Sequence, residues 1–273
     1  RTDYHTHTPL CHHAEGAPEV FVAQARALHM DAYGIADHMP MPEDGFDDWR
    51  MSLSDLPAYL EWIERARKAA AGTGLAVYAG LECDWLPGLE PWLDHLWELH
   101  PWDYLIGSAH YLTKDATVDG EECSAHSHFP TDDEDWCRYG CAVADMVASG
   151  KFDIVGHMDL VKIWGRRPTG EPSGYFAEAL DALEGSGMVV ELNTAGWHKR
   201  CAEQYPSDTL LRELLRRRIP IAIDSDAHSP AHLSRDWEQA LRLLDRLAGG
   251  RLRAYEHPAP HTQAPLHVYG INM

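Results

Sequence analysis

Short apolar runs alternate with longer amphipathic segments along almost the whole chain. The seven apolar runs are Asp3–His7, Ala32–Asp37, Ala76–Glu82, Tyr104–His110, Phe152–His157, Met188–Asn193 and Ile219–Asp226. The segments with helical periodicity are Pro18–His29, Ser54–Ala71, Leu89–Glu98, Thr131–Ser149, Ser173–Ser186, Ser207–Arg217 and Arg235–Leu247. The apolar runs are brief and bounded by Gly or Pro, which favours buried strands. Strands that alternate with helices in this way predict parallel βα units.

The continuity of this pattern predicts one domain. The chain has 273 residues, no fixed internal repeat and no polar linker that would divide it. We therefore expect residues 1–273 to form a single α/β domain in which about seven parallel strands close into a barrel. The final segment, His257–Met273, carries three prolines and lacks clear periodicity, and the sequence does not reveal its role.

The charge balance argues against two kinds of partner. The sequence holds 23 Lys and Arg against 43 Asp and Glu, a formal net charge of −20 at pH 7. Nucleic acid and anionic membranes are bound by cationic surfaces, so we expect neither as a partner. No apolar run is long enough for a transmembrane helix, and the first residues do not resemble a signal peptide. The six cysteines form no CxxC pair, so we expect reduced thiols in a cytoplasmic protein.

Residue types that bind metals stand at the ends of the predicted strands. The sequence holds 18 histidines against only 5 phenylalanines. Imidazole suits a metal site better than a hydrophobic core, so this excess of histidine indicates metal binding. The strand-end side chains are His5, His7, Asp37, His38, Glu82, His110, His157, Asn193, Asp226 and His228. Because the carboxyl ends of the strands in a parallel barrel meet at one face, we expect these side chains to converge there.

This convergence predicts a site for several metal ions. Residues i and i+2 of a strand share a face, so the stretch from His5 to His7 presents two imidazoles together. The stretch from Asp226 to His228 presents a carboxylate beside an imidazole in the same way. The competing interpretation is a network of paired polar core groups, but few cations are available to neutralise so many carboxylates. Imidazole and carboxylate ligands suit zinc, manganese or iron, and their number predicts two to three divalent ions.

The stretches that carry these residues resemble the PHP (polymerase and histidinol phosphatase) family. They follow in the family's order as Asp3–Ala14, Gly34–His38, Gly80–Asp84, Gly107–Tyr111, Asp153–Leu160 and Ser225–His228. The resemblance extends from Asp3 to about Ser229. Further stretches are similar to the histidinol-phosphate phosphatases of that family, namely Asp159–Gly165, Glu191–Gly196 and Glu203–Ser207.

The resemblance implies a distorted (β/α)7 TIM-like barrel with a trinuclear metal site. It implies one ion held by His5, His7, Glu82 and Asp226. It implies a second ion held by His110, His157 and Glu82, which bridges the first two ions. It implies a third ion held by His13, His38 and His228. His12 and His13 compete for the place in the first loop, and the family's spacing favours His13.

The implied reaction is hydrolysis of a phosphate monoester, with L-histidinol phosphate of histidine biosynthesis as the implied substrate. The catalytic residues are expected to be Glu82, Asp226 and His228. Asp226, His228 and a coordinated water remain alternatives as the group that protonates the leaving alcohol.

The candidate substrate-binding residues are Lys162, His198, Lys199 and Arg200. The family commonly has an arginine where this chain has His198, and Arg200 is a candidate to compensate for it. A solvated surface position is an equally consistent interpretation of each of the three cations. The predicted partner is a small phosphate ester, and the sequence does not indicate an oligomeric state.

Two other functions fit the same residues. One is a phosphoesterase for another small phosphate ester, a nucleotide or phosphotyrosine. The other is an inactive metal-stabilised scaffold, which the complete ligand set disfavours. Asp84, Asp159 and Asp224 are expected to orient the histidines. The acidic stretch 115–135 predicts a loop over the mouth, whose His126 and His128 are expected to be solvated.

Overall fold

The computed structural model describes residues 1–118 and 131–271, and the predictions for His126 and His128 lie outside the described residues. In this part of the chain, nine strands form one sheet in the order β1-β2-β3-β4-β7-β8-β9-β11-β10. The parallel strands are β1 (Thr2–Asp3), β2 (Ala32–Ile35), β3 (Ala76–Asp84), β4 (Tyr104–Ser108), β7 (Ile154–Val155), β8 (Val189–Asn193) and β9 (Ile221–Asp224). Each overlaps one of the predicted strands, which confirms the alternating pattern.

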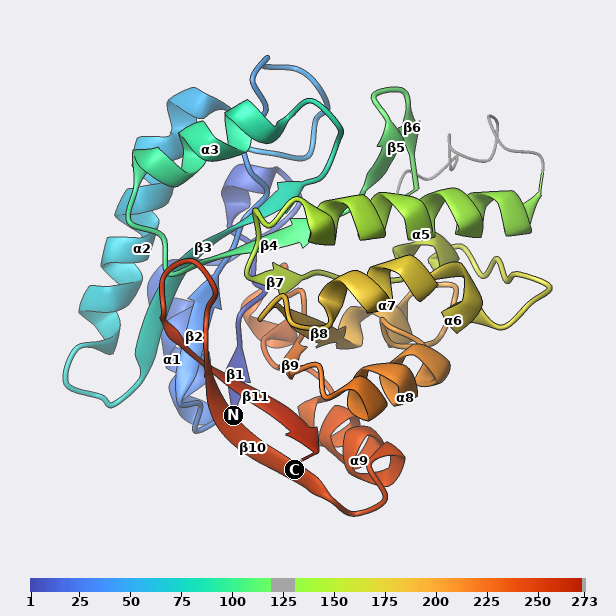
Figure 1. Ribbon diagram of the computed structural model, residues 1–273. Helices are drawn as coiled ribbons and strands as arrows, with labels where there is room; N and C mark the ends of the chain where they lie inside the picture. The colour runs from blue at the N-terminus through green and yellow to red at the C-terminus, as the bar shows by residue number, and fades with distance from the viewer. Residues whose placement is uncertain (119–130, 272–273) are drawn as a thin grey trace.

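The parallel strands curl into a barrel that closes beyond their carboxyl ends (Figure 1). Thr6, just after β1, forms a parallel bridge with Ala227, just after β9. The backbone N–H of His7 donates to the carbonyl of Ala227 at 2.9 Å. The predicted distorted (β/α)7 barrel is therefore confirmed, and it is closed by short bridges rather than by a long strand pair.

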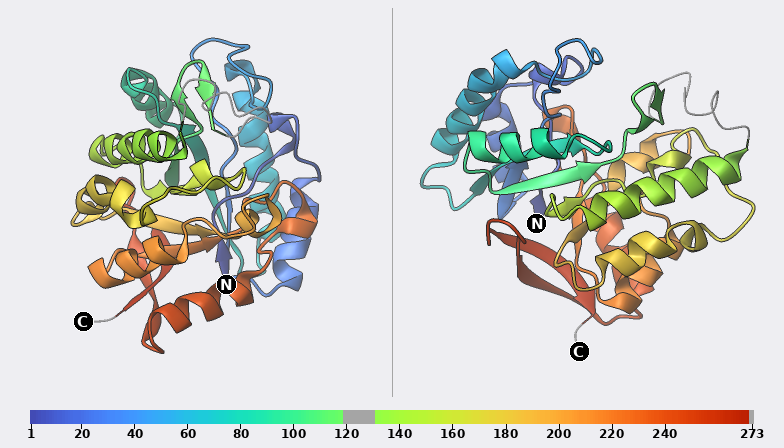
Figure 2. Two further views of the ribbon diagram at one scale, coloured as in Figure 1. Left: turned by 90° about the vertical axis from the view of Figure 1, so that its right-hand side faces the viewer. Right: turned by 45° about the horizontal axis from the view of Figure 1, so that its top comes forward.

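The C-terminal segment, whose role the sequence does not reveal, forms a hairpin at the end of the barrel opposite the mouth. Strand β11 (Pro265–Ile271) pairs antiparallel with β9 through Tyr269 and Ile221, and β10 (Leu252–Pro258) pairs along the length of β11. The hairpin lies at the lower edge of the molecule in Figure 1 and in the right-hand view of Figure 2.

Helices cover the outer face of the sheet (Figures 1 and 2). They are α1 (Pro18–Ala27), α2 (Leu56–Ala70), α3 (Glu90–Leu99), α5 (Asp132–Ala148), α6 (Pro172–Tyr175), α7 (Ala177–Leu183), α8 (Asp208–Arg217) and α9 (Trp237–Leu247). The helix predicted from Ser54 starts two residues later, because Ser52 and Asp55 form a capping box around a 3-10 turn before it. The helix predicted over Ser173–Ser186 is divided at Phe176. Within the described residues, no helix is both long and apolar enough to cross a membrane.

The connections between the strands and the helices contain short 3-10 turns. The 3-10 turns are η1 (Pro9–Cys11), η2 (Leu53–Asp55), η3 (Leu160–Lys162), η4 (Thr194–His198) and η5 (Pro230–His232). A small hairpin follows β4 and consists of β5 (Tyr111–Thr113) and β6 (Ala116–Thr117). In the described part of the predicted loop 115–135, β6 and the first turn of α5 are therefore regular elements.

Alternate strand residues separate two apolar clusters. On β4, Leu105 belongs to the cluster under the helices, whereas Tyr104 and Ile106 belong to a smaller cluster inside the barrel. The interior cluster also contains Leu266 and Val268 of β11, so the hairpin fills one end of the barrel. Two residues beyond the interior apolar positions Ile106, Val189 and Ala222, the same strand faces carry Ser108, Glu191 and Asp224. The period of two therefore replaces apolar side chains by polar ones toward the mouth.

Candidate metal centre

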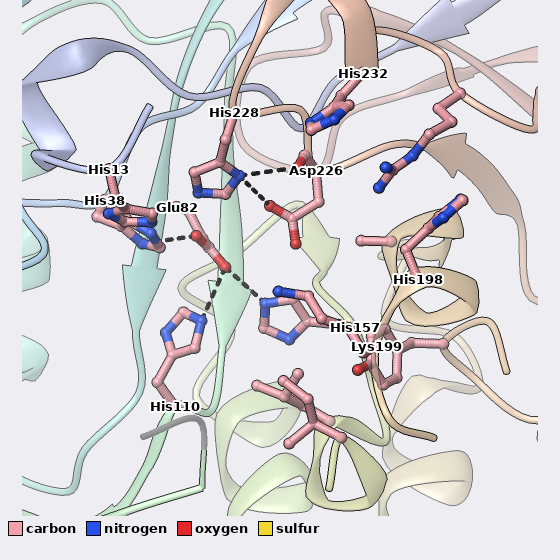
Figure 3. Close-up of a pocket in the computed structure, with 15 residues that line it drawn as sticks. His13, His38, Glu82, His110, His157, His198, Lys199, Asp226, His228 and His232 are labelled. Atoms are coloured by element: carbon pink, nitrogen blue, oxygen red, sulfur yellow. Dashed lines mark hydrogen bonds and ion pairs between the residues drawn. The ribbon is translucent and has the colours of Figure 1, made fainter. Parts of the chain in front are cut away.

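Glu82 is the centre of a cluster of imidazoles at the mouth of the barrel (Figure 3). Its carboxylate is buried, and it lies within 4 Å of nitrogens from His5, His7, His38, His110 and His157. The Oε1 atom lies 2.8 Å from His157 Nε2, and the Oε2 atom lies 2.8 Å from His38 Nδ1. The predicted strand ends are thus brought together around one carboxylate.

Asp226 and His228 extend the cluster on the side of the first loop. Asp226 Oδ1 lies 3.1 Å from His7 Nε2 and 3.5 Å from His228 Nδ1. The ring of His228 stacks on that of His7 at 4.1 Å and lies 4.5 Å from that of His13. His13 lines the same cavity, whereas His12 lines a separate pocket. The structure therefore brings together the nine predicted metal ligands, including His13 rather than His12.

The side chains present fit a group of cations. Several buried nitrogen and oxygen atoms in the cluster form no hydrogen bond of suitable geometry, although some of them lie within ion-pair distance of one another: His5 Nε2, His7 Nε2, His38 Nδ1, Glu82 Oε2 and His228 Nε2. Such atoms carry a desolvation penalty unless something compensates it. Potential ligand atoms lie within 4.8 Å of one another in the trios His5–His7–Glu82, His38–Glu82–His110 and His7–His38–His228. Atoms that share one transition-metal ion are spaced in this way, since each lies about 2 Å from the ion.

Three further carboxylates contact the Nδ1 atoms of three of these imidazoles. The Nδ1 atom of His5 lies 2.8 Å from Glu191, and that of His110 lies 2.8 Å from Asp84. The Nδ1 atom of His7 lies 3.2 Å from Asp37. When the Nδ1–H donates to a carboxylate, the Nε2 lone pair is free for a metal, and the ring orientation is fixed.

Of the three carboxylates predicted to orient histidines, Asp84 does so, and the other two do not hold an imidazole directly. Asp159 pairs with Lys162 at 2.8 Å, and Asp224 accepts the backbone N–H of Tyr4 at 2.6 Å. Glu191 is absent from the predicted set, although it lies two residues before the strand-end Asn193 on a strand buried throughout. Its position in the period of two is the signal that would have found it.

Electrostatics at the centre favour additional positive charge. Burial raises the pKa of the Glu82 carboxyl. The positive charges of the protonated imidazoles of His5 and His110 outweigh the effect of burial and hold that pKa well below its usual range. Burial likewise opposes protonation of His228, and the neighbouring His7 lowers its pKa further, to about 3. The imidazoles therefore cannot all be protonated to neutralise the carboxylates, whereas metal ions bind neutral imidazoles and neutralise the carboxylates together.

The centre opens into a cavity of about 450 Å³. This volume lies within the range of sites for small molecules. One part of its wall is less polar and is formed by Leu160, Ile163, Ala195 and Tyr205. His198 and Lys199 also line the cavity, on the side away from His13 and His38 in Figure 3. The cavity thus joins the metal cluster to a wall that can hold the rest of a small ligand.

Two of the candidate substrate-binding residues lie elsewhere. Lys162 is fully buried, and its ammonium lies 2.8 Å from Asp159 and 3.0 Å from Glu203. It also donates to the carbonyl of Gln204 at 2.7 Å, which uses its remaining hydrogen-bonding capacity. Arg200 is exposed and does not belong to the cavity wall. Lys162 and Arg200 are therefore not placed to contact a ligand in this cavity.

Comparison with known proteins identifies the family of the chain. The model of the PHP domain matches residues 3–195. A probable histidinol-phosphatase from Deinococcus radiodurans is 37% identical over 262 residues, which cover 93% of this chain and 96% of that protein. The histidinol-phosphatase of Bacillus subtilis is 27% identical over 265 residues, covering 88% of this chain and 98% of that protein.

A solved structure shows the same fold. Histidinol phosphate phosphatase from Lactococcus lactis, complexed with zinc, L-histidinol and phosphate, superimposes with a TM-score of 0.73. Its sequence is 23% identical, and the match covers 90% of this chain and 93% of that one. The curled α/β fold is therefore an arrangement already seen in a solved protein.

Proposed function

Because this chain belongs to the PHP domain family, we propose that it is a histidinol-phosphatase, which hydrolyses L-histidinol phosphate to L-histidinol and phosphate. The observation that carries the proposal is the convergence of five imidazoles on the buried carboxylate of Glu82 beside a small-molecule cavity. The 37% identity over nearly the full length of a histidinol-phosphatase supports the choice of substrate.

We propose two to three divalent ions, chosen from zinc, manganese and iron, as the cofactors. The residues that would hold them are His5, His7, His13, His38, Glu82, His110, His157, Asp226 and His228. Such ions supply Lewis acidity, which neutralises phosphate charge and makes a water nucleophilic at neutral pH.

The chain's own residues orient the ligands and bind the substrate. Asp37, Asp84 and Glu191 hold the Nδ1–H groups, so that the opposite ring nitrogens face the centre. Asp226 and His228 both lie in the cavity wall. Because burial and His7 keep His228 neutral, we propose that these two residues orient a water that protonates the leaving alcohol. Lys199 is proposed to contact the substrate there, and the apolar part of the wall excludes water from the leaving group.

We propose that residues 1–273 act as one domain, because the hairpin of β10 and β11 belongs to the same sheet as the barrel. The cytoplasm is the proposed location. The cysteines in the described part of the chain, Cys11, Cys83, Cys137, Cys141 and Cys201, carry free thiols, which fits a reducing compartment.

The test is phosphate release from L-histidinol phosphate by protein whose metal content has been measured. Nucleoside monophosphates and phosphotyrosine are assayed in parallel with each of the three metals. We expect L-histidinol phosphate to have the highest kcat/KM. A higher kcat/KM for a nucleotide or phosphotyrosine would contradict the proposed substrate.

Glu82→Gln tests the site itself. It removes the charge that the imidazoles surround, so we expect turnover to fall by at least about a thousandfold while circular dichroism keeps the signal of a folded protein. Glu61→Gln, on an exposed position of α2, is the matched control and is expected to retain activity. Unchanged turnover in Glu82→Gln would reject the proposed centre.

A further inference from the structure

Arg235 is a cationic residue of the cavity wall that the predicted substrate-binding set does not contain. It lies between η5 and α9 and lines the cavity together with Asp226 and His228. Its Nε atom is buried and has no hydrogen-bond partner. Within the described residues, no carboxylate forms an ion pair with its guanidinium, although Asp236 and Asp226 lie near enough to stabilise its charge. An arginine that lacks a partner in such a wall is available for an anionic ligand.

The backbone around Arg235 is held by contacts that fix its position. The N–H of Ser234 donates to the buried carboxylate of Asp3 at 2.7 Å. The carbonyl of Arg235 accepts the hydroxyl of Thr194 at 2.8 Å. These contacts link the residue to the chain at β1 and to the turn after β8, so its side chain starts from a rigid point at the mouth. Lys199, by contrast, is an exposed side chain.

The neighbouring acid is engaged by another residue. Asp236 follows Arg235 directly, and its Oδ2 atom lies 2.6 Å from His198 Nε2. His198 therefore engages a carboxylate that would otherwise compete for Arg235.

A phosphate ester needs a cation of this kind beside the metal ions. Its dianionic group presents several oxygens, and the planar fork of a guanidinium donates to two of them in parallel. Among the predicted cationic candidates, Lys162 is already paired and Arg200 lies outside the cavity. Arg235 and Lys199 are the Lys and Arg side chains of the described cavity wall.

We propose that Arg235 binds the phosphate group of the substrate, and that His198 is a positioning residue that keeps Asp236 away from it. This inference rests on the proposed phosphatase function and names the protein group that recognises the phosphate.

The first experiment measures inorganic phosphate binding to the metal-loaded protein by calorimetry. The variants are Arg235→Met, which removes the charge, and Arg235→Lys, which keeps it without the fork. We expect Arg235→Met to weaken phosphate binding by tenfold or more, with Arg235→Lys in between, because charged hydrogen bonds are lost. Arg246→Met, on an exposed face of α9, is the control and should bind phosphate like the wild type.

A change of less than fivefold in Arg235→Met would overturn the proposal, and so would a loss of bound metal from that variant. The binding measurement needs no turnover, so its result is separate from the failure of the wild type to hydrolyse L-histidinol phosphate. Inhibition of hydrolysis of p-nitrophenyl phosphate by phosphate provides a second readout on the same variants. An unchanged inhibition constant in Arg235→Met would also overturn the proposal.

The role of His198 is tested by a pair of variants. His198→Ala releases Asp236, which is then free to pair with Arg235, so we expect phosphate binding to weaken by several-fold. His198→Ala combined with Asp236→Asn removes the competing charge, and phosphate binding should return to within twofold of the wild type. A merely structural role of His198 would leave the double variant as weak as the single one, which would overturn the positioning role.

Discussion

Glu191 supports two of the proposed metal ligands with one buried carboxylate. Its Oε2 atom accepts from His5 Nδ1 at 2.8 Å, and its Oε1 atom accepts the backbone N–H of His157 at 2.5 Å. The side chain of Asn193 donates to the same Oε1 atom at 2.9 Å. Both carboxylate oxygens are thus hydrogen-bond acceptors, and a donor group in place of either oxygen would lose the hydrogen bonds that this oxygen accepts.

Glu191→Gln tests this arrangement. The amide keeps one acceptor but places an NH₂ group where the carboxylate accepted a second hydrogen bond, and it removes a charge near the cations. We expect metal affinity to fall by about 10- to 100-fold, measured by competition with a chelator. Glu61→Gln should leave the affinity unchanged. Equal affinities in Glu191→Gln and the wild type would show that Glu191 does not support the ligands.

His261 provides a pH-dependent contact between the hairpin connection and the barrel. Its Nδ1 atom lies 3.0 Å from the buried carboxylate of Asp153, and this hydrogen bond raises the pKa of the imidazole above its usual value against the opposing effect of burial. The stabilisation is therefore complete below about pH 6.5, the unfolded pKa, and is lost as the pH rises through the folded pKa.

The variant His261→Asn isolates this contribution. In urea unfolding of wild type and variant at equal metal content, we expect the wild type to exceed the variant in free energy of unfolding by more at pH 6 than at pH 8.5. The other histidines contribute to both proteins and cancel in the difference. A difference that stays constant between the two pH values would argue against a protonated His261 in the folded protein.

The elements that the sequence predicts well are those that the barrel buries on both faces. A strand such as β4 forms an almost continuous apolar run, because helices cover one side and the barrel interior covers the other. The C-terminal hairpin is different. Strand β10 is largely exposed, and β11 begins at the exposed Pro265 and then alternates between buried and half-exposed residues. Its stability comes from tertiary contacts with β9 and the barrel interior, which no local pattern records.

Leu266→Ala measures how much the hairpin contributes. Leu266 is fully buried in the interior cluster, so the substitution leaves a cavity that the strands around it can only partly fill. We expect a loss of about 2–5 kcal/mol in the free energy of unfolding, measured with urea. The adjacent His267→Ala, at a half-exposed position, should cost less than about 0.5 kcal/mol. A similarly small cost for Leu266→Ala would show that the hairpin does not seal the barrel.

The site as a whole is predictable only as far as the strands position it. Strand ends place Glu82, His110 and His157 at one mouth, because the topology of a parallel barrel leaves no other arrangement. The partners of long side chains are decided by contacts between distant loops. Lys162 follows a strand end, as the proposed metal ligands do, but its charge is neutralised by Asp159 and Glu203. Arg235 lines the cavity from a loop that carries no sequence motif.

The whole protein carries a net charge of −20, whereas the proposed substrate is an anion. The resulting electrostatic repulsion should depend on the salt concentration. At about 0.01 M salt the Debye length is about 30 Å, so the whole acidic body repels an approaching phosphate ester. At about 0.15 M it is about 8 Å, and only the charges near the mouth remain effective. We expect kcat/KM for p-nitrophenyl phosphate to rise several-fold over this range. Sodium chloride and potassium acetate should act alike, and a fall in kcat/KM with both salts would mean that local cations already dominate at long range.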